Sequence, residues 1–207
     1  YPVIETGLVL APRGIGVLFS LALAGILAGR VDPRALIGTG MAITAASLWW
    51  MAHWSLDMSF HPVIWSGLLQ GAGIGLIFSS MNLVAFATLP PRHRTDAASL
   101  LYLVRNLGAS VGISICTAQL ARTTQASHEI LTGNITETSL APLNPHLLEG
   151  AGSVGASLFS MIDAEITRQA MMIGYINDFY LLMAVALVSI PLVLLLKRPP
   201  PVPTTGR

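Results

Sequence analysis

One arginine lies far inside an apolar stretch of the sequence, with polar residues near it at helical spacing. Arg105 stands about nine residues from one end of the stretch 97–121, roughly 13 Å along a helix. Tyr102, Asn106 and Ser110 follow one another at intervals of four. A charge at this depth in a bilayer is costly unless it is paired or faces water. The pattern predicts a polar stripe along a water-filled pathway; structural pairing of Arg105 with a carboxylate or helix-end carbonyls is the alternative.

Three further polar residues lie in other apolar stretches. Gln70 and Asn82 share the stretch 62–89, where they either face a cavity or form hydrogen bonds in helix packing. Arg13 lies about six residues inside the first stretch and either faces the same pathway or extends to the membrane surface. The predicted substrate pathway comprises Arg13, Gln70, Asn82, Tyr102, Arg105, Asn106 and Ser110.

Glycines recur at intervals of four in two of the apolar stretches. Gly67, Gly71 and Gly75 lie in the third stretch, and Gly108 and Gly112 lie in the fourth. Small residues at this spacing line one face of a helix and let a neighbouring backbone approach closely. The five glycines are therefore predicted to be helix-packing positions.

The sequence offers little support for an enzyme. Residues Gly108 to Gly112 fit the pattern G-x-S-x-G, but a nucleophile elbow needs a strand-to-helix turn, and here the motif lies inside an apolar helical stretch. The five histidines show no metal-ligand spacing, so no metal or cofactor is expected. A net charge of +1 gives no reason to expect nucleic acid as a partner.

Five apolar stretches must position these residues. Hydrophobic residues form 53% of the chain and charged residues 10%, against about 25% charged in an ordinary soluble domain. A helix needs about 20 apolar residues to cross a bilayer. The sequence therefore predicts an all-α membrane protein with five transmembrane helices. We place them at about 7–28, 35–56, 62–89, 97–121 and 174–198. Between the last two, residues 122–173 are predicted to form a long extracytoplasmic loop with an amphipathic helix from about Val154, and residues 199–207 a cytoplasmic Pro-rich tail.

The charges in the gaps predict the orientation. Most basic residues lie in alternate gaps and in the tail, and the remaining gaps are mainly acidic. By the positive-inside rule the basic gaps are cytoplasmic, so the N-terminus lies outside and the C-terminus inside. Four tryptophans at the end of the second stretch and the start of the third fit an outer aromatic belt. The chain begins at Tyr1 without a methionine, and the simplest interpretation is that a preceding part is missing.

Two segments resemble a known transporter family. The loop Gly25-Ile-Leu-Ala-Gly-Arg30-Val-Asp32-Pro-Arg34 resembles the repeated G-x-L-a-D-R-x-G-R-R loop of the major facilitator superfamily, although Gly29 replaces the Asp of that motif. The segment from Asp96 to Gly112 is similar to the penultimate span of the EmrB/QacA-type drug:proton antiporters, which have fourteen spans. The run Leu-Ala-Pro-Arg-Gly-Ile-Gly at residues 10–16 also matches EmrB-like members.

The resemblance implies the C-terminal half-bundle of a proton-coupled multidrug efflux transporter. Its five spans would be the last five of fourteen, with the first, third and fourth lining a cavity and the second and fifth supporting them. The loop containing Gly25, Arg30, Asp32 and Arg34 would close the cytoplasmic side during alternating access. The best-known proton-carrying carboxylates of the family would lie outside this chain, in which we expect no deeply buried Asp or Glu.

The same resemblance implies a location and partners. The protein would lie in the bacterial inner membrane, in contact with lipid, and would move small amphipathic substrates against protons. Its partners would be the N-terminal half of the same chain and, in EmrB-like systems, a periplasmic adaptor and an outer-membrane channel. An exporter of one metabolite, siderophore or lipid is the alternative that these residues leave open.

Overall fold

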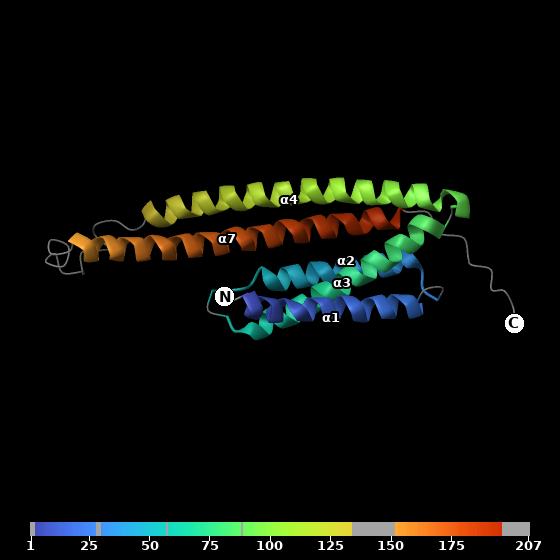
Figure 1. Cartoon of the computed structure of the whole chain (residues 1–207), viewed down its shortest axis with the longest axis horizontal. Helices are drawn as coiled ribbons and strands as arrows, with labels where there is room; N and C mark the ends of the chain where they lie inside the picture. Colours follow the sequence, from blue (N-terminus) through green and yellow to red (C-terminus); the bar gives the residue numbers. More distant parts are fainter. Residues whose placement is uncertain (1–2, 28–29, 57, 88, 134–151, 196–207) are drawn as a thin grey trace. The chain divides into compact units, whose positions relative to one another are not determined.

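The computed structural model describes residues 3–27, 30–56, 58–87, 89–133 and 152–195. These residues form five α-helices and one short 3₁₀ helix (Figure 1). The α-helices are α1 (Val3–Leu27), α2 (Pro33–Met51), α3 (Phe60–Ala87), α4 (Arg94–Gly133) and α7 (Gly152–Leu194), and the 3₁₀ helix is η1 (Pro91–His93). The prediction of an all-α membrane protein is confirmed in fold class.

Four of the described helices contain segments long and apolar enough to cross a membrane. They are Gly7–Leu27, Phe60–Phe86, Arg94–Thr132 and Ser160–Val193. The predicted span at 35–56 corresponds to α2, which has 19 residues and is not among these four. Arg34 in its first turn, together with its Gly, Thr and Ser residues, lowers its mean hydropathy, and hydropathy therefore does not identify α2 as a span.

The contacts divide the chain into two compact units. The first contains residues 1–110 and 179–207, and the second contains residues 111–178. In the first unit, α3 packs against both α1 and α2 (Figure 1). Several residues of α2 are buried, so one face of this helix lies against α3.

Small residues set the contact between α1 and α3. A Cβ atom added at Gly71 would meet the backbone carbonyl of Arg13, and one added at Gly75 would meet the Ser20 hydroxyl. Gly16 makes the reciprocal approach from α1, where an added Cβ would meet the Leu68 carbonyl of α3. The backbones of the two helices thus approach so closely that only glycine fits at these positions.

A second close contact joins α2 to α3. Gly40 of α2 and Gly73 of α3 lie against each other. A Cβ added at Gly40 would lie 2.8 Å from the Gly73 carbonyl oxygen, and one added at Gly73 would meet the Thr44 hydroxyl and the Gly40 carbonyl oxygen. Beside them, the buried Ser47 hydroxyl donates a hydrogen bond of 2.7 Å to the Ser66 carbonyl oxygen. This bond crosses from α2 to α3 and fixes the register of the pair.

Removing that inter-helix hydrogen bond should weaken the first unit. We expect Ser47→Ala to lower the free energy of unfolding by about 0.6 kcal/mol, and by no more than about 1.7 kcal/mol. Unfolding of the purified protein in mixed micelles by increasing SDS measures this difference. Ser189→Ala is the matched control, because the Ser189 hydroxyl bonds only the Val185 carbonyl of its own helix among the contacts described. Equal losses in the two variants would contradict the inter-helix role.

Helices α4 and α7 are much longer than a bilayer requires, and the second unit contains the part of α4 from Val111 and the part of α7 up to Asp178. Their 40 and 43 residues correspond to roughly 60 and 65 Å, against a hydrocarbon core of about 30 Å. The loop predicted over residues 122–173 is helical in its first part, since α4 continues to Gly133. The Asn134 sequon, the rest of the predicted loop to residue 151 and the tail at 199–207 lie outside the described residues.

The helical extension of α4 is held by α7. The His128 ring Nε2 lies 3.1 Å from Asp163 Oδ1, and a Cβ added at Gly174 would meet Leu120 and Thr124. A polar segment that lacks a hydropathy signal can stay helical when a second helix packs beside it. This packing is why a long helix replaces the predicted loop over residues 123–133.

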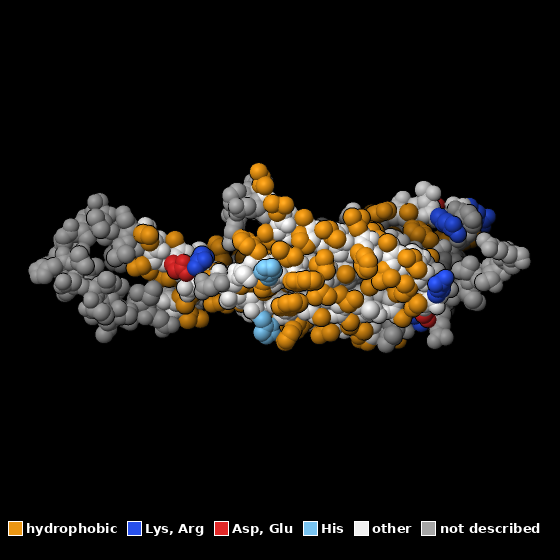
Figure 2. Space-filling view, turned by 90° about the horizontal axis from the view of Figure 1, so that it is seen from below, with side chains coloured by type: hydrophobic (Ala, Val, Ile, Leu, Met, Phe, Trp, Pro, Cys, Tyr) orange, Lys and Arg blue, Asp and Glu red, His pale blue; other side chains and the backbone are white. Residues whose placement is uncertain are grey.

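The surface of the first unit separates apolar and charged residues. Figure 2 shows hydrophobic side chains over most of the visible face, with several arginines gathered toward one end. Arg30 follows α1 and Arg34 lies in the first turn of α2, while Arg92 and Arg94 lie between α3 and the body of α4. An apolar band bounded by a basic end is the surface expected of a protein that spans a membrane.

Candidate functional site

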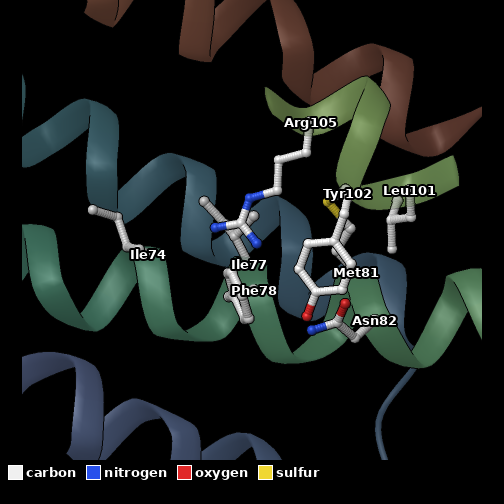
Figure 3. Close-up of a pocket in the computed structure, with 8 residues that line it drawn as sticks. All are labelled: Ile74, Ile77, Phe78, Met81, Asn82, Leu101, Tyr102 and Arg105. Atoms are coloured by element: carbon white, nitrogen blue, oxygen red, sulfur yellow. The ribbon is translucent and has the colours of Figure 1, made fainter. Parts of the chain in front are cut away.

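A pocket lies between α3 and the first part of α4, within the first unit. It has a volume of about 220 Å³. Eight residues line it: Ile74, Ile77, Phe78, Met81, Asn82, Leu101, Tyr102 and Arg105 (Figure 3). We call this cavity the Arg105 pocket.

Helical spacing brings the lining residues together. Ile74, Ile77, Phe78, Met81 and Asn82 recur at three- and four-residue intervals and therefore occupy one face of α3. On α4, residues 101, 102 and 105 likewise share one face. The pocket is thus an apolar surface of α3 faced by an arginine and a phenol from α4.

Arg105 is held over an aromatic ring. Its guanidinium carbon lies 4.1 Å from the centroid of the Phe78 ring, which is a cation–π contact. Such contacts stabilise by about 0.5–1 kcal/mol at exposed sites and by about 2 kcal/mol when desolvated. In Figure 3 the Arg105 guanidinium lies beside Phe78, and the Tyr102 hydroxyl points toward the Asn82 amide. Among the described residues, Arg105 forms no ion pair with a carboxylate.

Three of the seven residues predicted for the substrate pathway meet in this pocket: Asn82, Tyr102 and Arg105. Asn106 and Ser110 lie farther along α4 and are exposed, and the Ser110 hydroxyl donates a 3.0 Å hydrogen bond to the Asn106 carbonyl oxygen. Arg13 is exposed on α1, and Gln70 is half-buried on α3; neither lines the pocket. The seven residues are therefore not gathered at one site by the described part of the chain.

The glycines predicted to mediate packing fall into two groups. Gly71 and Gly75 lie against α1, and a Cβ added at Gly67 would be 3.8 Å from Arg13 Cβ, an ordinary contact. Around Gly108 and Gly112, by contrast, an added Cβ would meet no described atom within 4 Å. The described residues therefore give a close helix contact to the α3 glycines but not to the α4 glycines.

The predicted gating loop is the connection between α1 and α2. Gly25 lies in the last turns of α1, and Arg30 follows the end of that helix. Asp32 caps α2, because its side-chain oxygen Oδ1 accepts a hydrogen bond of 3.2 Å from the Arg34 backbone N–H, with Pro33 at the first helical position. Helix capping accounts for Asp32 in this structure, and the gating role stays a prediction.

Sequence reasoning missed two features of the site. The aromatic partner of Arg105, Phe78, was detectable only from its spacing with Asn82 on one helical face. The predicted span 174–198 would place Asp178 near its start, but this residue lies well inside α7 and is only 8% exposed. The expectation that the chain has no deeply buried acid is therefore wrong. Its oxygen Oδ1 is buried and has no hydrogen-bond partner among the described residues.

A catalytic reading of the serine motif has no support in this geometry. Ser110 lies within α4, where its hydroxyl is bonded to its own helix, and not at a strand-to-helix turn. The described residues also contain no group of three or more His, Cys, Asp or Glu side chains placed to hold a metal ion.

Comparison with known proteins places the chain in a family. The sequence model described as Major Facilitator Superfamily matches residues 1–123. The multidrug export protein EmrB of Escherichia coli K12 is 28% identical over 206 residues, which cover 96% of this chain and 39% of EmrB. The fatty acid resistance protein FarB of Neisseria gonorrhoeae is 29% identical over 196 residues, covering 93% of this chain and 38% of FarB. An uncharacterized transporter of E. coli K12, YebQ, is 36% identical over 118 residues, covering 56% of this chain and 26% of YebQ.

These matches agree with the all-helical fold. The chain spans about two fifths of the length of the curated relatives that it matches over nearly its whole extent. The apolar helices together with these relatives indicate a multi-pass protein of the inner membrane. The predicted resemblance to EmrB-type transporters is confirmed, and the chain belongs to the Major Facilitator Superfamily.

Proposed function

We propose that this chain provides part of a proton-coupled multidrug efflux transporter that works by alternating access. The observation that carries the proposal is the Arg105 pocket, which places a charged side chain and two polar side chains beside an apolar helix face in a membrane-spanning region. Similarity to multidrug export proteins over 96% of the chain supports the same conclusion. Ligand sites are typically apolar cavities with a few well-placed polar groups.

Asn82, Tyr102 and Arg105 are the residues that we propose contact substrate. Arg13, Gln70, Asn106 and Ser110 would face the pathway in other states of the transporter, since rocking of one bundle against another changes which helix faces are exposed. The loop with Gly25, Arg30 and Arg34 would lie on the cytoplasmic side, with the C-terminus. The basic end of the first unit supports this orientation.

We also propose that Asp178 carries the coupled proton. The Asp178 oxygen Oδ1 is buried without a hydrogen-bond partner among the described residues, which is costly for a charged carboxylate, and ionisable residues inside membrane segments are commonly functional. Asp178 lies near the middle of the apolar segment Ser160–Val193 and is largely buried. This role would place proton coupling partly within this chain.

The partners that we propose follow from the family and the length of the helices. The rest of a transporter bundle would complete the cavity. A periplasmic adaptor and an outer-membrane channel would complete an export path, and the parts of α4 and α7 that form the second unit offer a structure that could extend beyond the bilayer. The chain would act as a transporter and not as an enzyme.

Efflux from cells tests this function. Cells expressing the protein from its complete reading frame should export a panel of amphipathic compounds, and a protonophore should abolish the export. We expect Arg105→Ala, at equal membrane abundance, to reduce export by at least about tenfold, equivalent to 1.4 kcal/mol. Export of a single compound class would favour the specific-exporter alternative. Unchanged export by Arg105→Ala would contradict the role of the pocket.

A further inference from the structure

The lining of the Arg105 pocket contains one positively charged side chain and no negatively charged one. Arg105 supplies a guanidinium, which only donates hydrogen bonds, while Tyr102 and Asn82 supply groups that can donate as well. The other five lining residues are apolar or aromatic, and the lining contains no acidic side chain. The pocket therefore offers one positive charge and hydrogen-bond donors beside an apolar wall.

A ligand could replace Phe78 as the partner of the Arg105 guanidinium. Arg105 rests on the face of Phe78 at 4.1 Å, and none of the ion pairs among the described residues involves it. A carboxylate can accept two parallel hydrogen bonds from a guanidinium, a stronger and more directional interaction than a cation–π contact. A ligand with an anionic head group would therefore bind the Arg105 guanidinium in place of the Phe78 ring.

We infer that the Arg105 pocket binds amphipathic carboxylates, with the anionic head on Arg105 and the apolar chain along the α3 wall. This inference rests on the proposed function and names the substrate class of that site. The volume of about 220 Å³ lies below the range of about 300–1,000 Å³ that is usual for drug-sized ligands. The pocket thus suits a head group and a short chain better than a large polycyclic cation.

A cationic amphiphile fits the same pocket poorly. Its head would meet the like charge of Arg105, and the Phe78 face that could attract it is already occupied. We therefore assign the preference for an anionic head to Arg105, whose guanidinium lies on the face of the Phe78 ring.

Binding of two probes with the same chain and opposite heads tests the inference. The protein, purified from its complete reading frame and held in neutral-lipid nanodiscs, is titrated calorimetrically with octanoate and with octyltrimethylammonium, and the heats from empty nanodiscs are subtracted. We expect octanoate to bind at least tenfold more tightly. Arg105→Gln should remove that preference by weakening octanoate alone, and Arg105→Lys should retain part of it.

Arg122→Gln is the matched control, because Arg122 is another exposed arginine of α4 that does not line the pocket. This variant should bind both probes as the wild type does. Equal binding of the two probes by the wild type, or an equal loss of both in Arg105→Gln, would overturn the inference. If Arg105→Gln does not fold, the wild-type preference and Arg105→Lys still decide the question.

The outcomes also separate this inference from the proposed function. Octanoate binding that depends on Arg105, without protonophore-sensitive export from cells, would support the pocket assignment and contradict the transport proposal. Proton-driven export of cations, together with absent octanoate binding, would support transport and overturn the assignment of the pocket to carboxylates.

Discussion

Gly71→Val should destabilise the first unit by about 3 kcal/mol, at the upper end of the usual cost of overpacking. A Cβ at position 71 would meet the Arg13 carbonyl oxygen and lie 3.0 Å from its carbon and 3.1 Å from the Val17 nitrogen. These are backbone atoms of α1, so no side-chain rotation can make room, and α1 itself would have to move. Unfolding in mixed micelles and the amount of protein in the membrane both measure the loss.

Gly108→Val is the control for this substitution. Gly108 is also a helical glycine in a four-residue repeat, but an added Cβ there would meet no described atom within 4 Å. Because valine has a somewhat better helix propensity than glycine, the variant should be at least as stable as the wild type. Equal losses at the two positions would contradict the contrast and indicate that the Gly108 face is also tightly covered.

The glycine pair illustrates how far sequence reasoning reaches. The four-residue repeat predicts close packing for both helices, and the structure shows such contacts for Gly71 and Gly75. The repeat cannot identify the partner, because Arg13 and Ser20 lie on another helix and their approach depends on tertiary packing. The reciprocal glycines Gly16, Gly40 and Gly73 were missed for a related reason, since none belongs to a long repeat.

Hydropathy located the apolar parts of the helices but not the polar parts that extend beyond them. It located the apolar stretches, but it ended the fourth near residue 121, whereas α4 continues to Gly133. Polar helical residues carry no apolar signal, so the helix beyond the apolar segment could not be recognised. The same limitation concealed Asp178, because a span counted from Gly174 places this acid at its edge, while α7 begins at Gly152.

The pocket was predictable in part. Arg105 was identified from its depth and Tyr102 from its spacing, and both line the cavity with Asn82. Arg13 and Gln70 could not be assigned by type alone, because a polar residue in an apolar helix serves either packing or a pathway. Phe78 carried no polar signal, and only the geometry shows it beneath the guanidinium.

Asp178→Asn should abolish proton-driven transport while leaving substrate exchange intact. Asparagine keeps the size and shape of the side chain and is uncharged, but it cannot bind and release a proton. Asp178 is 8% exposed, with its oxygen Oδ1 buried and unpaired among the described residues, so the neutral amide should not destabilise the fold. In proteoliposomes, transport driven by a pH gradient should fall by at least about tenfold. Substrate counterflow, which needs no gradient, should persist.

Glu165→Gln is the control, because it removes an exposed acid from the same helix and so tests whether the effect requires a buried carboxylate. Glu165 is about half exposed and paired with Arg168 at 2.9 Å, and exposed pairs contribute little. Its loss should leave both forms of transport unchanged.

If Asp178→Asn still transported at full rate under a pH gradient, the coupled proton would not pass through this carboxylate. If counterflow were lost as well, Asp178 would be required for the conformational change itself. The combination of lost gradient-driven transport and preserved counterflow is specific to a proton carrier, because neither a packing defect nor a damaged substrate site separates the two.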